Sequence, residues 1–138
     1  MLDMILINPK SQALGIFDFL VAKSIPLGLG YVAAYLLEKN YTVKIIDEEV
    51  GRLDKEKIRA LTDNENQLFG ISSMTPTISR AYELADLIKS VFPKSTVVFG
   101  GIHPTVMPEE VLSRESVDLV VSGEAEPIIE EIVVSHHS

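Results

Sequence analysis

The sequence contains no cysteine, and this absence excludes several kinds of site at once. Without thiols these 138 residues can form no disulfide, no thiolate zinc site and no cysteine-held iron–sulfur cluster. Basic residues are also few, since 12 Lys and Arg stand against 20 Asp and Glu and give a formal net charge of −8. Nucleic acids and anionic membranes bind clustered Lys and Arg. Neither is therefore an expected partner.

Long apolar runs are missing as well. No stretch reaches the ~20 apolar residues that a membrane-spanning helix needs. The N-terminal Met-Leu-Asp-Met has an acid where a signal peptide needs positive charge. We therefore expect a cytoplasmic protein. Hydrophobic residues make up 46% of the chain, and a chain of this length buries roughly two-thirds of its unfolded surface, so residues 1–138 are expected to form one domain.

What the sequence does contain is a regular alternation of short apolar runs and amphipathic segments. Residues 68–77 read Leu-Phe-Gly-Ile-Ser-Ser-Met-Thr-Pro-Thr, an apolar run that ends in small hydroxyl residues, as a buried parallel strand does where it meets a helix. Strict alternation indicates a parallel sheet covered on both faces. We predict a three-layer α/β domain with five strands, of flavodoxin-like or Rossmann-like type. The predicted strands are residues 4–7, 43–46, 68–72, 96–99 and 117–121.

The helices follow from helical spacing of apolar residues and from proline and capping signals. Asp54 is a plausible N-cap. The long connection at 11–25, with a short helix expected at 17–21, is of a length that is more often functional than idle. The predicted helices are residues 26–40, 54–61, 78–92, 108–112 and 127–138.

One motif is misleading. Gly28-Leu29-Gly30-Tyr31-Val32-Ala33 matches the dinucleotide-binding pattern G-x-G-x-x-A, and Asp47 follows the second strand. That fingerprint must come directly after a strand so that the pyrophosphate meets the helix N-terminus. Here Pro26 precedes it, and the first strand lies about twenty residues upstream by the strand assignment above. We instead expect these glycines to let the helix approach the sheet or a ligand closely.

Two neighbouring strands end in small residues, and this indicates a ligand groove. Ser72 and its neighbours follow the third strand, and the Gly100-Gly101 pair follows the fourth. Ligands bind at the carboxyl edge of open α/β sheets, and paired glycines let a planar ligand rest on backbone. Each signal has an alternative, because the hydroxyls could cap the helix that Pro76 introduces and the glycines could form a tight turn. Together they favour the groove.

The remaining polar residues point to binding and not to catalysis. His103 is expected to be a hydrogen-bonded loop residue. Glu109 and Glu110 suit a helix start, where the dipole favours acids. Glu124 either plays the same part or lines the site. We find no nucleophile–base pair and no metal-ligand spacing, so no catalytic residue or metal site is predicted.

Four motifs in order carry a family resemblance. They read Pro-Leu-Gly-Leu-Gly-Tyr at 26–31, Gly-Ile-Ser-Ser-Met-Thr-Pro at 70–76, Gly-Gly-Ile-His-Pro-Thr at 100–105 and Gly-Glu-Ala-Glu at 123–126. With these motifs the chain resembles the N-terminal cobalamin-binding domain of cobalamin-dependent radical SAM enzymes. That group includes the anaerobic magnesium-protoporphyrin monomethyl ester cyclase type and many methyltransferases.

The resemblance implies a corrin ring over the carboxyl edge of the sheet and a nucleotide tail that passes Ser72 and the two glycines. Ser72 would hydrogen-bond the dimethylbenzimidazole, and a side chain on Gly101 would enter the space of the tail. The implied cofactor-binding residues are Asn8, Pro9, Leu27, Gly28, Leu29, Ser72, Ser73, Met74, Thr75, Gly100, Gly101, His103, Pro104, Gly123 and Glu124.

The sequence departs from its relatives in two places. The histidine-ligated methyltransferase module has Asp-x-His-x-x-Gly after its first strand, whereas residues 8–13 read Asn-Pro-Lys-Ser-Gln-Ala. Bound cobalamin is therefore expected to be base-off, without a histidine ligand. The radical SAM domain, with its Cys-x-x-x-Cys-x-x-Cys motif, is also absent. The tail, which includes His136 and His137 and is given no role, suggests a truncation point.

We thus expect a non-catalytic fragment whose full-length protein adds a C-terminal radical SAM domain with a [4Fe–4S] cluster and S-adenosylmethionine. The alternative to a fragment is a domain that works with a partner protein supplying that chemistry. Whether that enzyme transfers a methyl group or performs an oxidative cyclisation stays open. The alternatives are a stand-alone flavodoxin-like domain that binds FMN or a nucleotide, or an interaction domain that has lost its ligand.

Overall fold

The sheet has five parallel strands. A computed structural model describes residues 1–10 and 27–138; for Leu27 it describes the backbone but not the side chain. The strand order is β2-β1-β3-β4-β5, which is the flavodoxin-like order. The predicted five-stranded parallel α/β fold is therefore confirmed. The strands are β1 (Met4–Asn8), β2 (Val43–Asp47), β3 (Leu68–Ser72), β4 (Thr96–Gly100) and β5 (Leu119–Val120).

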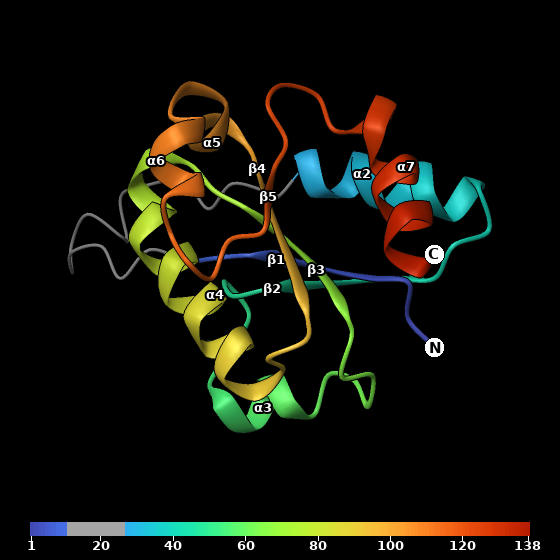
Figure 1. The fold of residues 1–138 in the computed structure, drawn as a ribbon, viewed down its shortest axis with the longest axis horizontal. Helices are drawn as coiled ribbons and strands as arrows, with labels where there is room; N and C mark the ends of the chain where they lie inside the picture. Colours follow the sequence, from blue (N-terminus) through green and yellow to red (C-terminus); the bar gives the residue numbers. More distant parts are fainter. Residues whose placement is uncertain (11–26) are drawn as a thin grey trace.

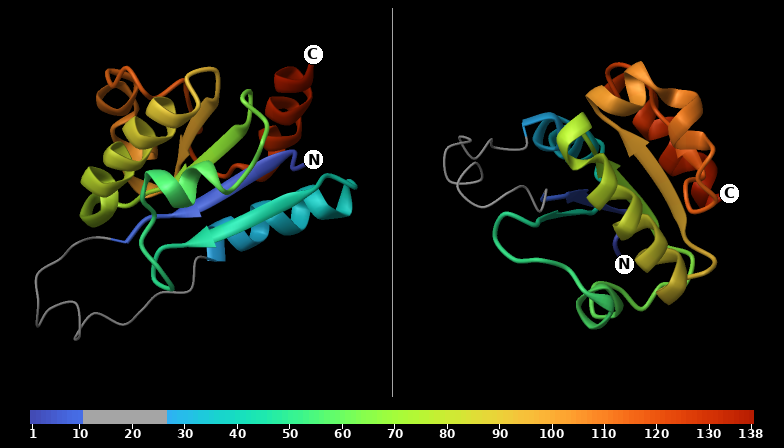
Figure 2. Two further views of the ribbon diagram at one scale, coloured as in Figure 1. Left: turned by 90° about the horizontal axis from the view of Figure 1, so that it is seen from below. Right: turned by 90° about the vertical axis from the view of Figure 1, so that its left-hand side faces the viewer.

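Helices cover both faces of this sheet and make three layers. In Figure 1, α2 and α7 lie side by side over one face, and α3, α4 and α6 lie over the other. The turned views show the strands running between these two helix layers (Figure 2). The helices are α2 (Leu27–Glu38), α3 (Lys55–Arg59), α4 (Ile78–Val91), α5 (Ile102–Val106), α6 (Pro108–Leu112) and α7 (Glu126–His137), with a 3₁₀ turn η1 (Thr75–Thr77) before α4.

The two faces of the sheet form two separate cores. Successive strand residues point to opposite faces, so Met4 and Leu6 pack toward α2 and α7, while Ile5 and Ile7 pack toward α3, α4 and α6. Burial of all four side chains is nearly complete. This continuous burial explains why the strand reads as an unbroken apolar run.

Most predicted elements differ from the observed ones by one or two residues at an end, and two differences are larger. The last strand contains only residues 119–120, because this edge strand pairs with β4 alone, through Leu119 and Val120. Residues 102–106, where no helix was predicted and His103 was expected in a loop, form α5. Pro104 is compatible with this helix because the first turn leaves its N–H groups without intrahelical partners. The predicted N-cap Asp54 is confirmed, since its carboxylate accepts the Lys57 N–H at 2.8 Å.

The C-terminal helix returns to the start of the chain. His137 Nε2 lies 3.0 Å from Asp3 Oδ1, and His136 Nε2 lies 2.6 Å from the Asn66 carbonyl oxygen. The two termini are accordingly close together in Figure 1. The two tail histidines therefore have a structural role that the sequence did not reveal. The short helix predicted at 17–21 lies outside the described residues, and no helix within the description is long and apolar enough to cross a membrane.

Candidate ligand-binding site

A cavity of about 310 Å³ lies between the sheet and the helix pair α2 and α7. It extends from the carboxyl ends of β3 and β4 down to Met4, the first residue of β1. Most of its wall is apolar. Its lining is Met4, Leu6, Gly28, Leu29, Tyr31, Val32, Gly70, Ile71, Ser72, Val98, Gly100, Gly101, Val121, Gly123, Glu124, Ala125, Glu126 and Ile129.

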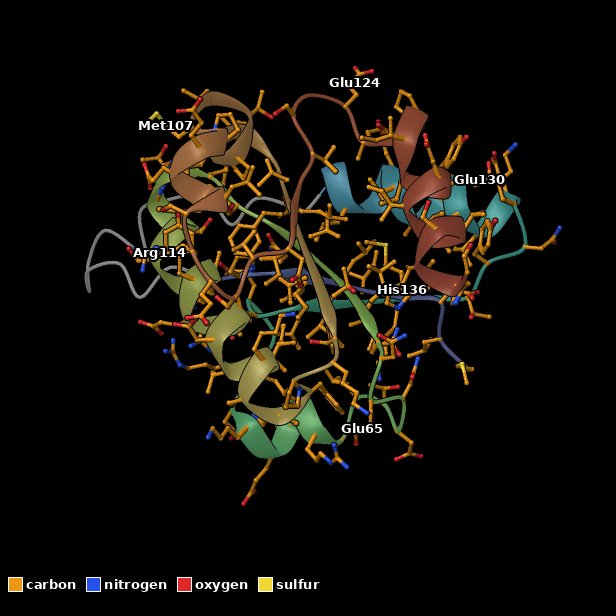
Figure 3. All side chains as sticks on the ribbon, in the orientation of Figure 1. Glu65, Met107, Arg114, Glu124, Glu130 and His136 are labelled. Atoms are coloured by element: carbon orange, nitrogen blue, oxygen red, sulfur yellow. The ribbon has the colours of Figure 1, made fainter. Side chains whose placement is uncertain are left out.

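Seven of the predicted binding residues line this cavity: Gly28, Leu29, Ser72, Gly100, Gly101, Gly123 and Glu124. Ser72 is half-buried at the end of β3 and brings a hydroxyl into a mostly apolar wall, whose other polar side chains are Tyr31, Glu124 and Glu126. Glu124 is exposed and projects outward from the connection between β5 and α7, at the top of Figure 3.

Glycines keep parts of the wall open. A β-carbon built on Gly28, Gly100 or Gly123 would have no atom within 4 Å. Gly30 also has nothing within that distance. Close approach of α2 to the sheet is therefore not the reason for its glycines, which corrects that part of the sequence interpretation. Among the glycines that line the cavity, Gly28, Gly100 and Gly123 instead leave space that a side chain would fill.

Gly101 has a different role from Gly100. Its φ is +106°, and a β-carbon there would lie 2.5 Å from the Ser73 carbonyl oxygen and 3.0 Å from the Ser73 nitrogen. The expectation that a side chain on Gly101 would project into the space of the tail is wrong, because that direction is occupied by backbone. Ser73 N–H donates to the Gly100 carbonyl at 2.9 Å, and the His103 N–H donates to the Ser73 carbonyl at 3.3 Å. Gly101 thus joins the ends of β3 and β4.

His103 is buried and faces away from the cavity. Its Nδ1 lies 3.2 Å from Thr75 Oγ1, and its Nε2 lies 3.2 Å from Glu110 Oε1. The Tyr82 hydroxyl donates to the same Glu110 oxygen at 3.1 Å. Burial and this carboxylate raise the pKa of Tyr82. The prediction of a hydrogen-bonded histidine is confirmed, although the residue belongs to α5, and the network links η1, α4, α5 and α6.

The other predicted residues whose side chains are described do not line the cavity. Asn8 Nδ2 donates to Asp47 Oδ1 at 3.1 Å, so this side chain connects the ends of β1 and β2. Pro9 and Pro104 are buried, while Met74 and Thr75 are exposed at the carboxyl edge. Ser73 is buried, and its hydroxyl has no hydrogen-bond partner within the described residues.

Sequence reasoning missed the deep part of the cavity. Met4, Leu6, Val98 and Ile129 line it, and none of them was a predicted site residue. A signal existed for Val98. It lies two residues before Gly100 in the same strand, and alternate strand residues share a face. No cluster of three or more potential metal ligands occurs in residues 1–10 and 27–138.

Comparison with known proteins gives a consistent family. The family model described as the B12 binding domain matches residues 20–133. Over 113 residues the chain is 31% identical to the anaerobic magnesium-protoporphyrin IX monomethyl ester cyclase of Rubrivivax gelatinosus, covering 80% of this chain and 20% of that protein. It is 30% identical over 130 residues to bacteriochlorophyllide d C-12(1)-methyltransferase of Chlorobaculum tepidum, covering 94% and 26%.

Solved structures with a similar fold are consistent with the family indicated by these sequence matches. The cobalamin-dependent S-adenosylmethionine radical enzyme OxsB, with aqua-cobalamin and S-adenosylmethionine bound, superimposes with a TM-score of 0.74 at 25% identity, covering 96% of this chain and 18% of that chain. The radical S-adenosylmethionine methyltransferase TsrM of Kitasatospora setae has the same fold, with a TM-score of 0.77 at 21% identity, covering 97% and 25%. The chain therefore spans about a fifth to a quarter of these relatives. It belongs to the B12-binding domain family and is related to cobalamin-dependent radical SAM enzymes, including the magnesium-protoporphyrin monomethyl ester cyclases.

Proposed function

We propose that this domain holds cobalamin at the carboxyl edge of the sheet, with the nucleotide tail in the cavity between the sheet, α2 and α7. The carrying observation is the cavity itself, which leads from Ser72 and Gly100 down to Met4. Its volume of about 310 Å³ lies at the lower end of the range for small-molecule sites, roughly 300–1,000 Å³. A mostly apolar wall with few polar side chains suits a flat aromatic base that needs few hydrogen bonds.

The residues present fit that tail. Gly28, Gly100 and Gly123 leave wall space that any side chain would fill, and the Ser72 hydroxyl, which lines the cavity, would hydrogen-bond a ring nitrogen of the base. Gly101 and His103 support the site indirectly, because their backbone contacts with Ser73 fix the end of β3.

The other proposed residues form the surroundings of the corrin. Asn8, Pro9, Leu27 and Leu29 would face the ring or the lower side of cobalt. Met74, Thr75, Pro104 and Glu124 would form the rim.

We further propose that the bound cofactor is base-off and has no histidine ligand. The chain has three histidines. His103 has both ring nitrogens within hydrogen-bonding distance of Thr75 and Glu110, on the side of the sheet opposite the cavity. His136 and His137 contact Asn66 and Asp3. When bound, cobalamin supplies a cobalt centre that can carry a methyl group or transfer electrons.

The domain is proposed to work as one module of a larger radical SAM enzyme that performs methyl transfer or oxidative cyclisation. The chain spans 20% of the cyclase and 26% of the methyltransferase that it matches. Because it has no cysteine, a [4Fe–4S] cluster and the S-adenosylmethionine bound to it would belong to another domain. No residue of this domain is assigned a catalytic role.

The direct test compares cobalamin with cobinamide, which has the corrin ring but no nucleotide tail. Titration of the purified chain followed by absorbance should show hydroxocobalamin binding at least about tenfold tighter than cobinamide, since burying an aromatic base contributes roughly that much. Equal affinities would contradict the tail site. Binding of FMN without binding of either corrinoid would favour the flavodoxin-like alternative.

A further inference from the structure

A buried ion pair lies beside the carboxyl edge of the sheet. Glu48 directly follows β2, and Arg80 lies in the first turn of α4; their side chains are 0% and 5% exposed. Arg80 Nε donates to Glu48 Oε1 at 3.0 Å, and Arg80 Nη2 donates to Glu48 Oε2 at 2.8 Å. This is the two-bond geometry in which guanidinium and carboxylate interact most strongly.

The pair also binds the backbone of two loops. Glu48 Oε1 accepts the Lys10 N–H at 3.2 Å, and Glu48 Oε2 accepts the Leu53 N–H at 2.9 Å. Arg80 Nη2 donates to the Leu53 carbonyl at 2.8 Å, while Nη1 donates to Glu83 at 3.0 Å. The pair therefore ties together α4, the segment after β2 and the residue that follows Asn8-Pro9 at the end of β1.

Folding stability alone does not account for this arrangement. Taking two charges out of water costs about as much as their attraction returns, and apolar replacements of buried ion pairs are often neutral or stabilising. An apolar pair could fill the same volume. It could not accept the Lys10 N–H, which would then be left without this partner.

We infer that Glu48 and Arg80 are positioning residues for the cobalamin site: by accepting the Lys10 amide, the ion pair fixes Asn8-Pro9-Lys10 beneath the place of the corrin. This rests on the proposed function, in which Asn8 and Pro9 face the lower side of the cofactor. The Asn8–Asp47 hydrogen bond, 3.1 Å long, holds the other end of the same segment. Neither Glu48 nor Arg80 lines the cavity.

Two double variants separate positioning from stability. Glu48→Gln/Arg80→Met removes both charges but keeps a side-chain oxygen that can accept the Lys10 N–H. Glu48→Leu/Arg80→Met removes the charges and the acceptor. The control is Asp118→Leu/Lys89→Met. It deletes a partly exposed 2.7 Å ion pair whose carboxylate also accepts a backbone N–H, from Val97 at 2.8 Å, at the opposite edge of the sheet.

The measurements are the dissociation constant for hydroxocobalamin, the urea unfolding midpoint and hydrogen exchange of the Lys10 amide. The Leu/Met variant should bind about tenfold more weakly, which is the usual effect of losing one charge-assisted hydrogen bond, and its Lys10 amide should exchange faster. The Gln/Met variant should bind within about threefold of the parent, since it retains that bond. The control should also bind like the parent, whatever its unfolding midpoint.

The outcomes are distinct. Equal binding by the Leu/Met and Gln/Met variants would overturn the positioning role while the proposed function stands. Weaker binding by the control, in proportion to its lost stability, would assign the effect to folding and overturn the inference. A parent chain that binds no cobalamin would overturn the proposed function and this inference with it.

Discussion

The ends of β3 and β4 meet through a contact that only glycine permits, because a β-carbon on Gly101 would lie 2.5 Å from the carbonyl oxygen of Ser73. The two strand ends are joined further by the hydrogen bond from Ser73 N–H to the Gly100 carbonyl. Gly100, the residue before Gly101, would have no atom within 4 Å of a β-carbon built on it, and it lines the cavity. The two glycines of one motif therefore have separable functions.

Stability should distinguish these two positions. Gly101→Ala should lower the free energy of unfolding by roughly 1–3 kcal/mol, since the residue has a φ of +106° and its new methyl group collides with backbone. Gly100→Ala should change it by less than about 0.5 kcal/mol, because open space receives the methyl group. Urea denaturation of the cofactor-free protein measures both values. Equal midpoints for the two variants would contradict the assignment.

Cobalamin binding, in contrast, should be sensitive to a side chain at Gly100. Gly100→Val should weaken cobalamin binding by about tenfold or more, because the isopropyl group fills cavity volume that the nucleotide tail would occupy. Cobinamide, which lacks the tail, should bind the variant and the parent alike. If Gly100→Val reduced binding of both corrinoids equally, the tail would not lie beside this residue.

Ser72 provides a smaller and more specific test. Ser72→Ala should weaken cobalamin binding by about 1 kcal/mol, which is typical of one neutral hydrogen bond. Its effect on folding should be small, since the hydroxyl lines a cavity and the residue is not fully buried. The affinity for cobinamide serves as the control and should not change. Unchanged affinity for cobalamin would remove Ser72 from the site.

The sequence was informative where local pattern decides structure. The strand at 68–72 and the N-cap Asp54 follow from an apolar run and a capping signal, and both are observed. The roles of Gly100 and Gly101 could not be separated, because they depend on φ and on the backbone of a neighbouring strand. The Glu48–Arg80 pair joins residues 32 positions apart, and no periodicity or motif marks such a contact.

Acid should weaken the fold partly through Glu48. Burial alone would raise the pKa of this carboxyl, but the hydrogen bonds from Arg80, Leu53 and Lys10 hold it below its ordinary value of 4.5. A carboxyl with a depressed folded-state pKa stabilises the protein fully above its unfolded-state value, and this contribution is lost as pH falls through the folded-state value. Unfolding free energies measured between neutral pH and about pH 3 should therefore fall less steeply in Glu48→Leu/Arg80→Met than in the parent. Parallel curves would show that Glu48 does not contribute.

The environment of cobalt gives the last prediction. The segment 8–10 contains no histidine, and His103 is occupied by Thr75 and Glu110 on the far side of the sheet. An imidazole ligand would require His103 to break both contacts and cross to the cavity side, leaving Glu110 and Thr75 without it. The electron paramagnetic resonance spectrum of the chain with cob(II)alamin should therefore lack the triplet splitting that an axial nitrogen produces.

The same spectrum of His103→Gln provides the control. Glutamine can still hydrogen-bond Thr75 or Glu110 but offers no imidazole, so the spectrum should equal that of the parent. Triplet splitting in the parent that persists in the variant would mean that the dimethylbenzimidazole itself binds cobalt, and the tail could not then lie in the cavity. Splitting that disappears in the variant would identify His103 as the ligand and show that its contacts with Thr75 and Glu110 are broken when cobalamin binds. An unsplit spectrum in both proteins agrees with a tail held in the cavity by Ser72 and the open glycine positions, with no protein or cofactor nitrogen on the metal.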